Sequence, residues 1–166
     1  MILMLIRVAC AGESTPETLV SRADSLRQNG SLVQSFSIYR NVASAPLTGC
    51  ERARVALGMA AIHWTAGNLS EMSPQLDVVR HSCNTCPKHV RTPMALEYAE
   101  LSMQSGATSD ALVCLERELA LSPQPALLRD VELALAQLHF VEGHWQKVWS
   151  DTPPDLGCQA EGLRLQ

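Results

Sequence analysis

Apolar residues recur at three- and four-residue steps in eight stretches of the chain, a pattern that predicts amphipathic helices. Four of these stretches end at a glycine, and another stretch begins directly after it. Glycine readily ends a helix and opens a tight turn, because it adopts positive φ angles at no steric cost. The pattern therefore predicts helical hairpins. The eight stretches are 19–29, 31–44, 53–66, 68–82, 94–105, 107–122, 131–142 and 144–151.

The four turn glycines keep a nearly constant spacing. Gly30, Gly67, Gly106 and Gly143 follow one another at intervals of 37 to 39 residues. A plain helical bundle, which remains the alternative, needs no such phase. A repeat protein does, because each hairpin buries its apolar face against the next one. We therefore expect an all-α chain of at least seven helices, with turns at these glycines and with no strand.

The pattern resembles the tetratricopeptide repeat, a helix–turn–helix unit of about 34 residues. The third unit matches best, with Ala99, Gly106, Ala111, Leu115 and Pro123 at the family's positions. The resemblance covers about residues 17–151 and implies an α-solenoid of about four antiparallel hairpins wound into a right-handed superhelix. Matching residues in the other units are Gly30, Ser35, Tyr39 and Pro46, then Ala60, Gly67, Met72 and Leu76, then Ala136, Gly143 and Val148.

Residue size along the repeat predicts how the helices pack. Small residues such as Ala60 and Ala136 let the two helices of a unit approach closely, and large ones such as Leu76 fill the space between units. Pro74 falls inside the second helix of the second unit, where a proline removes a backbone donor. We therefore expect a delayed start or a kink in that helix.

The resemblance also implies where a partner binds, because ligand contacts in this family cluster on the exposed face of the first helix of each unit. Charged groups mixed with Trp64, Met103 and Phe140 suit a peptide or helix with apolar anchors. For Trp64 and Phe140, core packing is the alternative. The matching positions are Asp24, Arg27, Gln28, Arg54, Trp64, Thr65, Glu100, Met103, Gln104, Asp130, Gln137 and Phe140.

Composition favours a helical protein, and the sequence motifs give no support for catalysis. Apolar residues make up 46% of the 166 residues, but aromatic residues only 4%, and such small or unbranched apolar residues suit helix packing. The net charge of −4 includes no basic cluster, so nucleic acid is not an expected partner. Phosphate-loop, GxSxG and HExxH motifs are absent from the sequence. The spacing of Glu97 and Glu100 is typical of an ordinary solvated helix face. We expect no cofactor.

The segment HSCNTCPKH, residues 81–89, gathers His81, Cys83, Cys86 and His89. Cysteine and histidine are the preferred zinc ligands, but four ligands this close in sequence seldom form a tetrahedral site. The segment lies between two hairpins, as does Cys50. A disulfide from Cys83 to Cys86, or from either of them to Cys50, is the main expectation. Free thiols and a metal or redox role are the alternatives. His63 and His139 are expected to be packing residues.

The N-terminus resembles the end of a bacterial lipoprotein signal peptide, in which the cysteine after a small residue is lipidated. The run MILMLIRVA precedes Cys10, and a small, polar segment follows it. Arg7 departs from that pattern, as does the lack of a basic segment before the apolar run. The resemblance implies a signal-peptide remnant at 1–9 and a tether at 10–16, before the repeat domain at 17–151 and a tail at 152–166. A packed or frayed apolar end is the alternative.

Together these features predict a scaffold without catalytic activity that binds a peptide or helix of another protein in a concave groove. With a lipid anchor at Cys10, it would lie in the periplasm or at the outer membrane. There it would assist assembly of an envelope, pilus or secretion complex. A cytoplasmic chaperone or adaptor with the same groove is the alternative, and a metal-binding or thiol-redox protein using residues 81–89 is a weaker one.

Overall fold

The computed structural model describes residues 15–82 and 85–151, and within these ranges it contains helices and no strand. This confirms the expected all-α class and the minimum of seven helices. The helices are α1 (Pro16–Gln28), α2 (Leu32–Val42), α3 (Gly49–Thr65), α4 (Leu69–Ser82), α5 (Lys88–Ser105), α6 (Thr108–Ala120), α7 (Leu128–Val141) and α8 (Trp145–Asp151), with a short 3-10 helix, η1 (Pro125–Leu127), before α7.

The four predicted glycines lie at the turns between α1 and α2, α3 and α4, α5 and α6, and α7 and α8. Gly30, Gly67, Gly106 and Gly143 have φ angles of 78°, 70°, 79° and 76°, in the left-handed region that favours glycine. In each turn, the residue after the glycine donates its N–H to the carbonyl five residues earlier, at 2.8–2.9 Å. This is the bond of the Schellman motif. The regular spacing in the sequence therefore corresponds to one turn geometry used four times.

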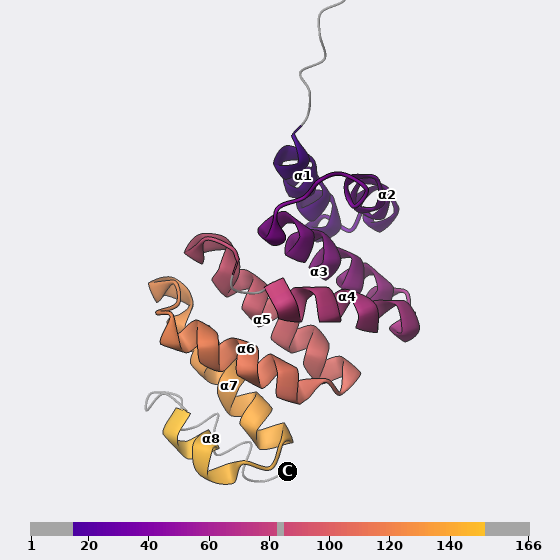
Figure 1. The fold of residues 1–166 in the computed structure, drawn as a ribbon. Helices are drawn as coiled ribbons and strands as arrows, with labels where there is room; N and C mark the ends of the chain where they lie inside the picture. The colour runs from indigo at the N-terminus through magenta and orange to yellow at the C-terminus, as the bar shows by residue number, and fades with distance from the viewer. Residues whose placement is uncertain (1–14, 83–84, 152–166) are drawn as a thin grey trace, which may run out of the picture.

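The hairpins follow one another from α1 at one end of the molecule to α8 at the other (Figure 1). The two helices of each hairpin contact each other, and the first helices also contact in sequence, α1 with α3, α3 with α5 and α5 with α7. A row formed by α1, α3, α5 and α7 therefore continues through the described part of the chain.

Apolar packing forms two clusters. The larger one draws its buried residues mainly from α3 to α7, and the smaller one joins α1, α2 and α3. Ala60, Ala99 and Ala136 are fully buried, and so is Leu115, in keeping with the predicted close approach of helices. His139 is buried as well, and the His63 ring packs edge-on against Phe36 with centroids 5.4 Å apart.

Of the two alternatives expected for α4, a delayed start or a kink, the delayed start is wrong. The helix begins at Leu69, directly after the turn, and continues through Pro74 to Ser82. Pro74 is only the sixth residue of the helix, and its exposed ring lies in solvent. Because proline has no N–H, the Ser70 carbonyl loses one helical hydrogen bond. Proline at the same depth recurs in α5, where Pro93 is the sixth residue.

An ion pair that the sequence pattern did not indicate fastens α5 to α6. The Glu118 side chain on α6 is only 2% exposed, and one carboxylate oxygen lies 2.5 Å from the Arg91 Nε atom. The other oxygen accepts a hydrogen bond from the Thr92 hydroxyl at 2.5 Å. That hydroxyl in turn accepts the Gln124 N–H at 3.1 Å. The buried carboxylate thus has partners for both oxygens, which such burial requires.

Candidate functional site

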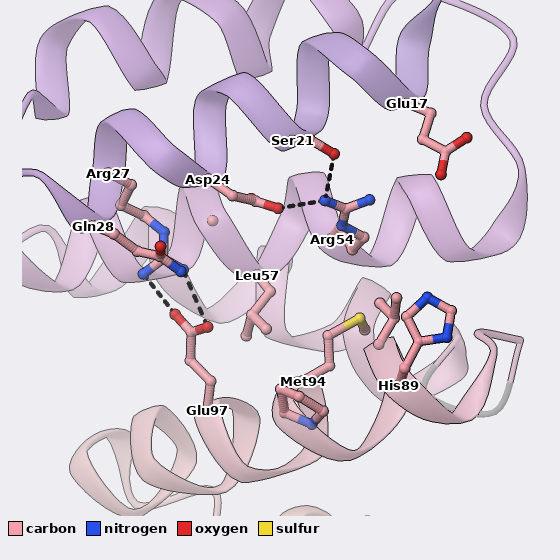
Figure 2. A pocket seen from close by; sticks show the side chains of 13 residues that line it. Glu17, Ser21, Asp24, Arg27, Gln28, Arg54, Leu57, His89, Met94 and Glu97 are labelled. Carbon is pink, nitrogen blue, oxygen red and sulfur yellow. Dashed lines mark hydrogen bonds and ion pairs between the residues drawn. The ribbon is translucent and has the colours of Figure 1, made fainter. Parts of the chain in front are cut away.

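A pocket of about 370 Å³ lies on the row of first helices, between α1, α3 and α5 (Figure 2). Its walls combine charged and apolar side chains. Leu57 and Met94 are buried apolar residues in its lining, whereas Glu17, Gln28 and His89 are exposed. The full lining is Glu17, Ser21, Asp24, Arg27, Gln28, Arg54, Leu57, Gly58, His89, Val90, Pro93, Met94 and Glu97.

Helical periodicity explains why these residues share one surface. The α1 residues 17, 21, 24 and 28 recur at steps of three and four, as do the α3 residues 54, 57 and 58 and the α5 residues 90, 93, 94 and 97. Each helix therefore presents a single stripe to the pocket. The start of α3 is fixed by a capping box, in which the side chains of Thr48 and Glu51 bond to each other's backbone N–H.

Asp24 organises the first polar cluster of the pocket. Its carboxylate accepts hydrogen bonds from the buried Tyr39 hydroxyl and, at 2.6 Å, from the Arg54 guanidinium. The same Arg54 nitrogen bonds to the Ser21 hydroxyl at 3.2 Å. Burial and the neighbouring Asp24 charge both raise the pKa of Tyr39. Tyr39 therefore stays a neutral donor, and it holds Asp24 and, through it, Arg54 in place.

A second ion pair spans the pocket from α1 to α5. The Arg27 guanidinium lies 2.7 Å from one Glu97 carboxylate oxygen and 3.1 Å from the other, a two-pronged geometry that fixes orientation. Burial lowers the pKa of Arg27, but attraction and hydrogen bonding from Glu97 outweigh it and the net pKa is raised. Burial raises the pKa of Glu97, and Arg27 offsets part of that rise. This pair joins two helices that are far apart in sequence.

A disulfide lies beside the same pocket. Cys50, in the first turn of α3, is bonded to Cys86, two residues before α5, with their Cα atoms 4.8 Å apart. The Cys86 sulfur contacts the Met94 sulfur at 3.6 Å, and Met94 lines the pocket. This bridge is one of the pairings expected from the sequence. Cys83 falls outside the described residues, as do Cys10 and the segments 1–14 and 152–166.

The structure gathers part of the predicted binding surface into the pocket and leaves the rest elsewhere. Asp24, Arg27, Gln28 and Arg54 all line it. Thr65 instead borders a separate, mostly apolar hollow of about 350 Å³ together with residues such as Phe36. The remaining exposed polar residues of that set lie on α5 and α7 outside the pocket: Glu100, Gln104, Asp130 and Gln137.

The three expected apolar anchors lie outside this pocket. Met103 is half-buried and packs against the larger core cluster. The half-buried Phe140 ring packs edge-on against Trp145 of α8, with centroids 4.8 Å apart. Trp64 is 37% exposed at the end of α3. The apolar surface inside the pocket comes instead from Leu57, Val90, Pro93 and Met94.

Glu97 corrects one interpretation of the sequence. The expected solvated face joins Glu97 to Glu100, but only Glu100 is exposed, whereas Glu97 binds Arg27. Helical spacing distinguishes Glu97 from Glu100. Glu97 lies three residues after Met94 and seven after Val90, so it shares the helix face that lines the pocket. Sequence reasoning also misses Glu17 and Ser21, which share the α1 stripe with Asp24.

The segment 81–89 forms no metal site in the parts of the chain that can be described. Cys86 is held in the disulfide, so it is not available as a thiolate ligand. His81 is exposed, and its Nδ1 atom lies 2.7 Å from the Asp77 carbonyl. Across residues 15–82 and 85–151, no group of three or more His, Cys, Asp or Glu side chains is placed to hold a metal ion.

Comparisons with protein-family models, with curated proteins and with solved structures find no match to this chain. Within the described ranges, the helices are also too short or too polar to cross a membrane.

Proposed function

We propose that this protein is a scaffold without catalytic activity that binds a peptide or helix segment of a partner in the pocket of α1, α3 and α5. The observation that carries the proposal is the double ion pairing of the pocket, Asp24 with Arg54 and Arg27 with Glu97. These pairs fix the polar walls before any ligand arrives. A preformed surface loses little conformational entropy on binding, so more of the contact energy remains as affinity.

The lining suits recognition of a side-chain-bearing segment. Val90 and the exposed Pro93 supply accessible apolar contact area, since Leu57 and Met94 are only 3% and 6% exposed. Glu17, Gln28 and His89 are exposed groups available for hydrogen bonding. Sites of this kind combine an apolar surface with a few polar groups that set orientation. The pocket lies on the row of first helices, so a bound segment can extend along α5 towards α7.

The lining residues favour binding over catalysis. The Ser21 hydroxyl contacts the Arg54 guanidinium, which is a permanent cation and cannot act as a base. Activation of a hydroxyl nucleophile needs an adjacent general base. Arg54 and Arg27 are each committed to a carboxylate. These contacts are those of a rigid recognition surface.

A tetratricopeptide-like solenoid is part of the same proposal. Its support is the repetition of one turn geometry at four glycines and the contacts between consecutive first helices. In such a stack each hairpin covers the apolar face of its neighbour, and the superhelix presents a concave binding surface. The small buried residues at equivalent positions, Ala60, Ala99 and Ala136, fit this arrangement.

For the cellular location we propose the bacterial periplasm or outer membrane, with a lipid on Cys10 and a role in assembling an envelope, pilus or secretion complex. The disulfide between Cys50 and Cys86 supports an oxidising compartment. The chain expressed from its native locus should then fractionate with membranes, and Cys10→Ala should release it. A soluble native protein that retains Met1 would exclude the lipid anchor and favour the cytoplasmic adaptor.

Binding is tested by selecting peptides from a random display library on the full chain and measuring their affinity by calorimetry. Gln28→Ala should weaken binding by about 1 kcal/mol, roughly fivefold, as loss of an interface contact does. The matched control is Gln34→Ala, because Gln34 is also an exposed helical glutamine but lies outside the pocket, on α2. Equal effects of the two substitutions, or no selectable peptide, would contradict the proposal.

A further inference from the structure

The disulfide joins the start of α3 to the chain just before α5. The start of α3 is better stabilised by capping than the start of α5. α3 begins with the complete capping box of Thr48 and Glu51. α5 begins after Pro87, which makes no side-chain capping bond, and its first turn holds no acidic residue. The N–H groups of Val90 and Arg91 both donate to the Pro87 carbonyl at 2.9 Å, whereas the N-cap residue offers no side-chain acceptor to the first N–H groups of the helix.

Charge weakens the start of α5 further. Lys88, His89 and Arg91 are basic groups in its first turn. The partial positive charge of a helix N-terminus repels cations, and it favours acids at that position. Arg91 is compensated by its ion pair with Glu118. Lys88 is exposed, and the helix N-terminus repels its charge.

Pro93 removes one more stabilising bond from the same end. A proline has no N–H, so the His89 carbonyl loses the donor that the residue at position 93 would otherwise supply. From Arg91 onward the helix is secured by other contacts. Arg91 and Thr92 bind Glu118 of α6, and Met94 belongs to the larger core cluster. Between Thr85 and Val90, Cys86 is buried in the larger core cluster and Val90 packs partly against it. The weakly held part is therefore 87–89, which carries the pocket residue His89 and leads into the pocket residue Val90.

We propose that the Cys50–Cys86 disulfide is a redox-sensitive brace that holds the His89–Val90 wall of the pocket against α3. This inference rests on the proposed function, because it describes how binding at the same pocket is regulated. A dithiol reductant transfers two electrons and two protons to the bridge. The S–S bond breaks, Cys50 and Cys86 become thiols, and the reductant becomes a disulfide. The start of α5 then frays, and the wall opens.

Hydrogen exchange with mass spectrometry tests the brace without any ligand. The full chain is compared in its oxidised form and in the presence of dithiothreitol. Reduction should speed exchange in a peptide spanning 88–92 through local opening, by roughly tenfold or more at the amides of Val90 and Arg91, which donate to the Pro87 carbonyl. Amides 95–104 of the same helix should change little. Unchanged exchange at 88–92 would overturn the proposal. Faster exchange along the whole chain would also overturn it, because the bridge would then support the entire fold.

The variant Cys50→Ala separates this bridge from the other cysteines. With or without dithiothreitol, the variant should exchange at residues 88–92 at the rate of the reduced parent protein. An effect of dithiothreitol that persists in Cys50→Ala would assign the change to another thiol and overturn the proposal. If peptide selection fails while the exchange result holds, the brace stands and the proposed function falls. If peptides bind but reduction leaves exchange unchanged, the proposed function stands and the brace falls.

Discussion

Gly58 on α3 lies directly against the ring of Tyr39 on α2, so closely that a Cβ atom at position 58 would overlap the ring carbons. Tyr39 is fully buried and cannot move aside into solvent. Its hydroxyl donates to Asp24, which holds Arg54 in the pocket. The missing side chain at Gly58 therefore provides the space that positions a polar cluster two contacts away.

Gly58→Ala should destabilise the fold by roughly 1–3 kcal/mol, the usual cost of overpacking a filled core. The substitution would otherwise be favourable, because alanine has the better helix propensity. Chemical denaturation of the two proteins measures the difference. The double variant with Tyr39→Leu removes the far end of the ring and should recover part of the loss. A stabilised single variant would show that α2 and α3 are not in such close contact.

The turn glycines give a second prediction. Gly30 and Gly67 have positive φ angles, and a Cβ atom added at either position would meet no other atom within 4 Å. Alanine at either site should therefore cost about 1 kcal/mol from backbone conformation alone. Asn29→Ala is a suitable control, because Asn29 is adjacent and has a φ angle of −85°. Thermal melts in which both glycine variants match the control would contradict the shared turn geometry.

The buried carboxylate of Glu118 gives a third prediction. Glu118→Gln keeps the size of the side chain but leaves the Arg91 charge without its counter-ion, which should cost roughly 3 kcal/mol. Glu116→Gln on the same helix is the control, because Glu116 is 43% exposed and its nearer partner, at 3.0 Å, is the exposed Lys147, while the buried His139 lies 3.9 Å away. Removal of the Glu116 charge should cost less than about 1 kcal/mol. Similar losses of unfolding free energy in the two variants would show that the Arg91–Glu118 pair stabilises the fold no more than an exposed pair.

Tyrosine ionisation gives a fourth prediction, based on pH. The chain contains two tyrosines. Burial raises the pKa of Tyr98 to about 12, and it raises the pKa of Tyr39 as well. Above the ordinary value of 10.0, the unfolded chain releases these protons while the folded chain retains them. Their contribution to stability is therefore complete below that pH and declines as the pH rises through the folded pKa values.

Absorbance titration of the native and the denatured chain measures this effect, together with melting temperatures on both sides of the ordinary tyrosine pKa. The native protein should show little tyrosinate until it unfolds, and its melting temperature should fall as the pH increases. Reversible ionisation of both tyrosines near the ordinary value, without unfolding, would contradict the burial of Tyr39 and Tyr98.

The helices and their turns could be predicted from the sequence, because apolar periodicity and turn glycines determine the backbone conformation over only a few neighbouring residues. Asp24, Arg27, Gln28 and Arg54 could also be predicted as neighbours on one surface, since the repeat phase places first helices side by side. Contacts set by residues far apart in sequence are not predictable in this way. Glu97 resembles a surface residue in the sequence because its partner, Arg27, lies 70 residues away.

The start of α5 is not predictable for a different reason. Its first six residues carry basic groups and a proline, so local propensity argues against a helix there. Tertiary contacts override that propensity. Arg91 and Thr92 bind Glu118, and the disulfide fixes Cys86. The residues that propensity places outside the helix include His89 and Val90, which form one wall of the pocket.

The central claim is that the pocket of α1, α3 and α5 holds a partner segment, and the most direct measurement is a crystal structure of the chain with a peptide selected on it. The peptide should lie against Val90 and Pro93, with polar contacts to Gln28 or His89, and the Asp24–Arg54 and Arg27–Glu97 pairs should remain intact. A peptide bound on another face, or one that enters only by breaking those ion pairs, would contradict the account.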